Sequence, residues 1–186
     1  MLNVDRGEFE QAEAAYRKAI EIGPDFLPAH FNLATFYNQT GRNAEAEQVL
    51  RDGLKRFPEE GELHYSLGLL LAEEQRLPAA AKSLRRATEL LPRRARIHYN
   101  LALALQHLER REEAEAALQQ AHRIDSRDPR IVNALAIFYM QAENWVEARS
   151  WARRLVALAP PGAPGPQQLL QRIESEGVGE GAAESP

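Results

Sequence analysis

The sequence contains no cysteine, which excludes disulfide bonds, thiolate metal sites and thiol catalysis. Lysine is scarce, because Lys18, Lys55 and Lys82 are the only lysines among 23 basic residues and arginine supplies the rest. The formal net charge is −4, so the composition gives no general reason to expect a nucleic-acid partner. No apolar run approaches the roughly 20 residues that a membrane-spanning helix requires, and we expect no membrane partner.

The opening residues, MLNVDRGEFE, lack the apolar stretch of a signal peptide. We therefore expect a cytoplasmic location for this chain alone, or a periplasmic one if it belongs to a longer exported protein. With 186 residues, of which 44% are hydrophobic, the chain is long enough to bury a sizeable core.

Residues of one kind recur along the chain at a fixed step of 34 positions, which is the sign of a repeat architecture. One of these series consists of prolines and is interrupted once, by Ser126. The proline, leucine and small-residue series are Pro24, Pro58, Pro92 and Pro160; Leu33, Leu67, Leu101 and Leu135; Ala34, Gly68, Ala102 and Ala136; Ala12, Ala46, Ala80, Ala114 and Ala148. Several series in phase predict one structural unit, repeated without insertion from residue 7 to residue 160.

Each unit reads as two helices. The segment HFNLATFYNQTGR, residues 30–42, carries apolar residues at helical spacing and then meets Gly41, which favours a helix end. The next segment, AEAEQVLRDGLKRF, is again helical in period and ends before Pro58. Because one hairpin cannot bury its apolar stripe alone, neighbouring hairpins must stack.

These residues resemble the tetratricopeptide repeat, whose pattern begins W-x2-L-G-x2-Y. Here the pattern reads H-x2-L-A-x2-Y from His30 to Tyr37, and His64 and His98 hold the same position in the next two units. The resemblance covers residues 7–160. It implies an all-α fold, a right-handed superhelical α-solenoid of antiparallel helix hairpins. It also implies a non-catalytic protein-protein interaction scaffold that needs no cofactor and binds a peptide segment of a partner protein in its concave groove.

The register predicts a layout of four parts. Residues 1–26 form half a repeat, 27–162 form four repeats, 163–176 form a capping helix, and 177–186 form a disordered tail. The four repeats occupy 27–60, 61–94, 95–128 and 129–162. The half repeat suggests a second interpretation, in which the chain is the C-terminal regulatory or docking region of a larger protein such as a transferase, kinase or multihaem cytochrome. It also predicts self-association through an exposed apolar face, or fraying of the first helix.

Chemical sites are not indicated. Equivalent residues of stacked repeats lie roughly 10 Å apart, whereas zinc ligands lie about 2 Å from the metal, so His30, His64 and His98 are interpreted as packing residues. His107 and His122 are interpreted as surface residues. The carboxylates Glu73, Glu74, Glu112 and Glu113 are interpreted as parts of solvated helix faces. No phosphate-binding loop or nucleophile elbow is present, and we expect no enzyme activity, metal or cofactor.

The resemblance places the binding surface on the first helix of each hairpin, where positions three and four residues apart share a face. That face offers aromatic rings, an apolar strip, carboxamides and two guanidiniums. The predicted peptide-binding residues are Phe31, Asn32, Tyr65, Leu69, Arg96, Tyr99, Asn100, Leu103, Arg130, Asn133 and Ile137.

Two alternatives bear on this prediction. The aromatic residues could instead pack between adjacent hairpins. The cluster Arg85, Arg86, Arg93, Arg94 and Arg96 could bind an anionic partner, including RNA, although the interleaved aromatics expected for single strands are missing. No lysine lies on the predicted face, so the lysine-asparagine carboxylate clamp of family members that bind chaperone tails is not expected.

Overall fold

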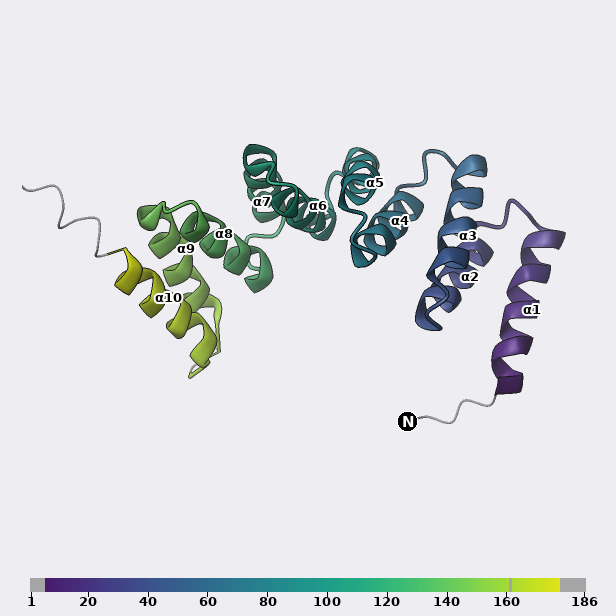
Figure 1. Ribbon diagram of the computed structural model, residues 1–186, viewed down its shortest axis with the longest axis horizontal. Coiled ribbons are helices and arrows are strands. Elements are labelled where there is room, and N and C mark those ends of the chain that lie inside the picture. The colour runs from purple at the N-terminus through teal and green to yellow at the C-terminus, as the bar shows by residue number, and fades with distance from the viewer. Residues whose placement is uncertain (1–5, 161, 178–186) are drawn as a thin grey trace, which may run out of the picture. The chain divides into compact units, whose positions relative to one another are not determined.

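The computed structural model describes residues 6–160 and 162–177, and these residues form α-helices without any strand (Figure 1). The ten helices of this described part are α1 (Arg6–Ile22), α2 (Leu27–Gln39), α3 (Asn43–Arg56), α4 (Gly61–Glu73), α5 (Leu77–Leu90), α6 (Ala95–His107), α7 (Arg111–Ile124), α8 (Pro129–Gln141), α9 (Trp145–Leu158) and α10 (Pro164–Glu176). The predicted all-α class is therefore confirmed. The predicted disordered tail lies outside the described residues except for Gly177, which ends α10.

The chain divides between Pro92 and Arg93 into two compact units. In unit 1, α2 packs against α3 and α4 against α5, while α1 contacts α2 and α3 contacts α4. In unit 2, α6 packs against α7 and α8 against α9, while α7 contacts α8 and α10 packs on α9. Consecutive helices joined by short turns thus form the hairpins that the repeat predicts (Figure 1).

The residues of the repeat series form the core. The four leucines of the series that starts at Leu33 are at most 6% exposed. The four second-helix alanines of the repeat series, Ala46, Ala80, Ala114 and Ala148, are at most 1% exposed, because each lies where its helix meets the first helix of the hairpin. Gly68 marks a still closer approach: a Cβ atom there would lie 2.7 Å from Cγ of Leu84 on α5.

The turn inside each hairpin has one conformation in all four repeats. Gly41, Gln75, Glu109 and Glu143 occupy the same repeat position and have φ angles of 74°, 60°, 58° and 57°. In each case the amide of the following residue donates to a carbonyl five residues earlier, as in the 2.8 Å bond from Arg42 N to Tyr37 O. This is the Schellman arrangement, which ends a helix through a left-handed residue. The sequence predicted a helix end at Gly41, but not this turn conformation.

Within each unit, ion pairs or hydrogen bonds link a hairpin to the helix before it. Arg42 binds the carboxylate of Glu13 on α1, and Tyr37 donates to the same carboxylate. The bond to Arg42 is the main reason that the pKa of Glu13 is lowered. In unit 2, Tyr139 donates to Glu115 at 2.6 Å in the equivalent place. These contacts were not predicted, although Glu13 and Glu115 stand three repeat steps apart in the sequence.

The helix α1 exposes positions that are covered in the other hairpins. Ala12, Tyr16 and Ala19 are partly exposed, whereas the equivalent residues of α3 are buried. Ile22, at the end of α1, is 75% exposed. Self-association through this surface stays a prediction.

Candidate functional site

The eleven predicted binding residues all lie at the surface of first helices. Each is exposed or half-buried, and none belongs to the fully buried core. Phe31 is partly buried against the core of unit 1, so the packing alternative holds in part for this ring. The predicted side chains that line a hollow or depression fall into three groups.

The first group lines a hollow between α2 and α4, which we call the unit-1 hollow. It encloses 170 Å³. Its walls come from α2 and α4, and α3 contributes two buried residues. The lining residues are Phe31, Ala34, Thr35, Asn38, Ser66, Leu69, Leu70 and Glu73, with Ala46 and Leu50 from α3. Of the predicted residues, Phe31 and Leu69 are therefore brought together here.

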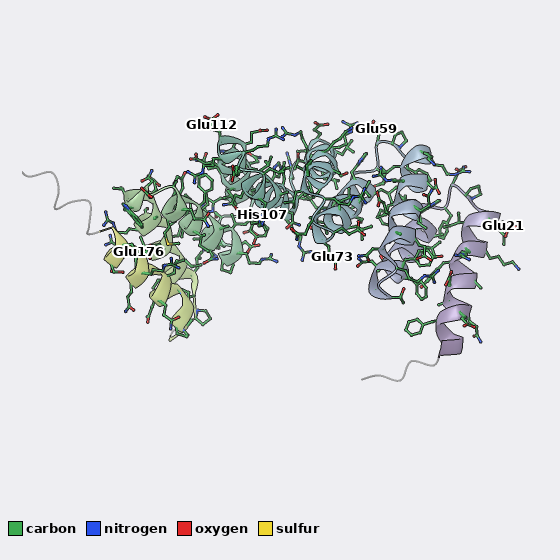
Figure 2. All side chains as sticks on the ribbon, viewed as in Figure 1. Glu21, Glu59, Glu73, His107, Glu112 and Glu176 are labelled. Carbon is green, nitrogen blue, oxygen red and sulfur yellow. The ribbon has the colours of Figure 1, made fainter. Side chains whose placement is uncertain are left out.

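A hydrogen bond joins the two walls of the unit-1 hollow. Asn38 on α2 donates from Nδ2 to Oε2 of Glu73 at 3.2 Å. The same amide group lies 3.4 Å from Oδ1 of Asn43. Glu73 is the last residue of α4 (Figure 2). Its carboxylate therefore belongs to the hollow, and not only to a solvated helix face as the sequence suggested.

The second group lines a hollow between α6 and α8, which we call the unit-2 hollow. It encloses 290 Å³ and has more polar walls. The lining residues are Tyr99, Leu103, Gln106, His107, Asn133, Ala134, Ile137 and Gln141. Four of the predicted residues meet here, namely Tyr99, Leu103, Asn133 and Ile137. His107, interpreted as an ordinary surface residue, closes the end of α6 (Figure 2).

The third group is basic and lies apart from both hollows. Arg96 and Arg130 line a shallow depression at the beginnings of α6 and α8, together with Asp125 and Asp128. Arg130 is already paired, because its Nη2 lies 2.6 Å from Oδ2 of Asp128. This pair lowers the pKa of Asp128 and raises that of Arg130. A guanidinium held in this way is less available to a bound peptide than an unpaired one.

Three predicted residues line neither the two hollows nor the basic depression. Asn32 is exposed on α2, and Tyr65 and Asn100 are half-buried on α4 and α6. Sequence reasoning missed the residues that close the C-terminal ends of the hollows, Glu73 and Gln141. Their signal was available, because they stand at the same repeat position as Gln39 and His107.

The repeat histidines have a structural role that their spacing did not reveal. Nε2 of His30 and of His64 lies 2.9 Å from the carbonyl oxygen of Pro24 and of Pro58, so each ring ties a first helix to the proline turn before it. Within residues 6–160 and 162–177, no three His, Asp or Glu side chains lie together in a way that could hold a metal ion.

His122 differs from the surface residue that the sequence suggested. Its ring packs edge-on against Trp151 of α9, with 4.8 Å between the ring centroids. Burial is the main cause that lowers its pKa, and the nearby Arg154 lowers it further. In the part of the chain that is described, neither His122 Nδ1 nor Trp151 Nε1 has a hydrogen-bond partner.

None of the described helices is long and apolar enough to cross a bilayer. Each hollow is an apolar pocket with a few polar groups. Such a pocket can bind side chains and form hydrogen bonds with backbone amides.

Comparison with solved structures finds the same fold in other proteins. A crystal structure of MamA shares 22% identity over 82% of this chain and 90% of that one, with a TM-score of 0.75. YrrB, described as a TPR protein with an unusual peptide-binding site, shares 21% identity over 91% of this chain and 84% of that one, with a TM-score of 0.74. PilF of Pseudomonas aeruginosa shares 24% identity over 96% of this chain and 82% of that one, with a TM-score of 0.76. Identities this low establish the fold alone.

No curated protein sequence matches the chain. A family model does: over residues 1–185, the sequence matches the model described as the cilia and flagella-associated protein 70 C-terminal domain, a tetratricopeptide-repeat family. The match covers nearly every residue and agrees with the hairpins of both units. The chain therefore belongs to the family of the cilia and flagella-associated protein 70 C-terminal domain, and its fold is that of a tetratricopeptide-repeat protein.

Proposed function

We propose that the chain is a non-catalytic interaction scaffold, and that each of its two hollows can hold a peptide segment of a partner protein. One observation carries the proposal: each unit has a partly apolar hollow between its first helices, and its lining includes apolar residues that repeat packing leaves exposed or half-buried. Leu69 is 39% exposed, although leucines at core positions are almost completely buried. Such an exposed apolar strip between polar groups is typical of a surface that a partner covers.

The chemistry of the linings suits a peptide. Phe31 and Leu69 offer apolar area in unit 1, and Tyr99 and Ile137 offer it in unit 2. Asn133 carries both a donor and an acceptor, so it can pair with the backbone of an extended segment. The peptide-binding site named for YrrB supports the same use of the fold in this chain. The proposed activity requires no cofactor, nucleic acid or membrane.

The test begins with peptides selected from a random display library on the purified chain, labelled and titrated by fluorescence anisotropy. We expect Leu69→Ala or Tyr99→Ala to weaken binding by about 1 kcal/mol or more, since truncated interface anchors cost at least this much. Lys82→Ala is the matched control, because Lys82 is an exposed residue of the second helix α5 and lines neither hollow. Equal affinities for all variants, with unchanged circular dichroism, would contradict the proposal.

A second candidate function has one supporting observation. The family is described as a C-terminal domain, which favours a docking region within a larger protein. Reading the coding sequence upstream of Met1 tests it. A continuous reading frame would support this candidate, and an in-frame stop codon would contradict it.

A further inference from the structure

We infer that the unit-1 hollow selects a peptide in which a lysine or arginine lies close to an apolar side chain. This inference rests on the proposed function and specifies the ligand of one of its two sites. It follows from the charge and shape of the hollow rather than from the repeat pattern.

The apolar part of the inference comes from the walls. Phe31 and Leu69 face a space of 170 Å³ whose inner lining includes Leu70 and Leu50. Leu50 and Leu70 are almost completely buried, at 2% and 4% exposure, so the inner lining is firm, while Leu69 remains open to solvent. A leucine, methionine or aromatic side chain of a ligand would exclude water from this space, and burial of apolar area is favourable.

The cationic part comes from Glu73. Among the described residues that line the hollow, Glu73 is the one that carries a formal charge. Its carboxylate accepts one hydrogen bond, from the neutral amide of Asn38. A carboxylate has about four lone-pair sites, so acceptor capacity remains for a ligand. No ion pair is formed by Glu73 within residues 6–160 and 162–177.

Neighbouring carboxylates are already neutralised, which sets Glu73 apart. Glu74, the next residue, pairs with Arg76 at 3.2 Å. Glu47 pairs with Arg76 and Arg51, and these contacts lower its pKa. A lysine or arginine of the ligand could therefore pair with the carboxylate of Glu73, which lies beside the apolar wall of the hollow.

The unit-2 hollow provides the contrast. Its described lining contains no carboxylate, and His107 and Gln141 hold the positions equivalent to Glu73. We therefore expect the preference for a cation to belong to unit 1 alone. Because glutamine stands at this repeat position in Gln39 and Gln141, Glu73→Gln introduces a residue that the fold already accepts there.

The experiment combines the display selection with a double-mutant cycle. Peptides selected on the wild-type chain are sequenced, and the strongest binder with a lysine beside an apolar residue is synthesised with that lysine and with norleucine, which keeps the aliphatic stem without the charge. Each peptide is titrated against the wild-type chain, Glu73→Gln and Gln141→Glu. We expect Glu73→Gln to lower the affinity for the lysine peptide by about two- to fivefold, as for a solvent-accessible ion pair. The affinity for the norleucine peptide should not change.

Three results would overturn the inference. They are an absence of lysine and arginine from the selected peptides, equal effects of Glu73→Gln on both peptides, and insensitivity of the lysine peptide's affinity to salt. Each leaves the proposed function intact as long as Leu69→Ala still weakens binding. If Leu69→Ala has no effect while peptides bind, the binding surface lies elsewhere and the proposed function fails with it. An enhanced preference for lysine in Gln141→Glu would further support charge at this repeat position as the determinant.

Discussion

The contact between Gly68 and Leu84 allows a prediction whose sign depends on the neighbour. Alanine occupies the equivalent position in the other three repeats, so the repeat pattern alone suggests that Gly68→Ala is harmless. The structure indicates otherwise, because the new Cβ would lie 2.7 Å from Leu84 Cγ and 3.2 Å from Leu84 N. Neither atom is the free end of a flexible side chain, and Leu84 is fully buried.

The magnitude follows from two opposing effects. Replacing glycine with alanine inside a helix stabilises it by about 1 kcal/mol, whereas overpacking a filled core costs about 1–3 kcal/mol. We therefore expect Gly68→Ala to lower the free energy of unfolding by about 1 kcal/mol in the wild-type background. Leu84→Ala alone should cost about 2–5 kcal/mol.

In the Leu84→Ala background, the same glycine substitution should reverse its sign. The methyl group then enters space that Leu84 has vacated, so Gly68→Ala should stabilise by about 1–2 kcal/mol through helix propensity and methyl burial. The coupling between the two positions is then about 2 kcal/mol or more. Urea titrations followed by circular dichroism at the helical band measure all four proteins.

Gly165 supplies the control for this cycle, because nothing lies within 4 Å of a Cβ built there in the first turn of α10. Gly165→Ala should not be destabilising in either background. The reasoning is refuted if Gly68→Ala changes stability by the same amount with Leu84 and with alanine at that position.

Two further predictions concern single residues. Glu109→Gly should raise the free energy of unfolding by about 0.5–1 kcal/mol, and Gly41→Ala should lower it by a similar amount, because both turns are left-handed; urea titrations in which the two changes have the same sign would contradict this. Burial lowers the pKa of His122 below its ordinary 6.5, so the unfolded chain binds more protons than the folded chain below that pH. The stability that the neutral ring contributes is present above about pH 6.5 and is lost as the pH falls toward the folded pKa. Thermal melts from pH 7.5 to 5.5 should therefore show a steeper loss for the wild-type chain than for His122→Gln, and equal slopes would contradict the assignment.

Much of the fold could be predicted from the spacing alone. A core leucine must recur at the same place in every repeat, because stacked hairpins bury the same stripe, and Leu33 and Leu135 are buried as expected. The sequence predicted a helix end at Gly41, but not the left-handed conformation of the turn. Glu109 and Glu143 adopt that conformation without the glycine that favours it, so they share it with Gly41 by repeat position and not by residue type.

The candidate site was predicted in outline and not in its grouping. Helical spacing identifies the face on which a residue lies, but not how deeply its neighbours enclose it. Ser66 and Leu69 line the unit-1 hollow, for example, whereas the adjacent Tyr65 does not. Charge was harder still to assign. Glu73 and Glu74 look alike in the sequence, but Glu73 lines the hollow and Glu74 pairs with Arg76.

The arginines show the same difficulty from the opposite side. Arg130 was predicted to bind the peptide, yet its guanidinium is already paired with Asp128 at the N-terminal cap of α8. A pairing between residues two positions apart across a helix start depends on side-chain direction, which the repeat pattern does not specify.

Site-specific photo-crosslinking tests the central claim most directly, because it reports which surface touches the ligand. A benzophenone amino acid is placed at Thr35, an exposed residue that lines the unit-1 hollow, or at Lys82 on α5, which does not line it. Each protein is irradiated with a peptide selected from the display library and analysed by mass spectrometry. The account predicts crosslinked peptide from position 35 and none from position 82. Crosslinks from position 82 with none from position 35 would place the ligand on another face and contradict it.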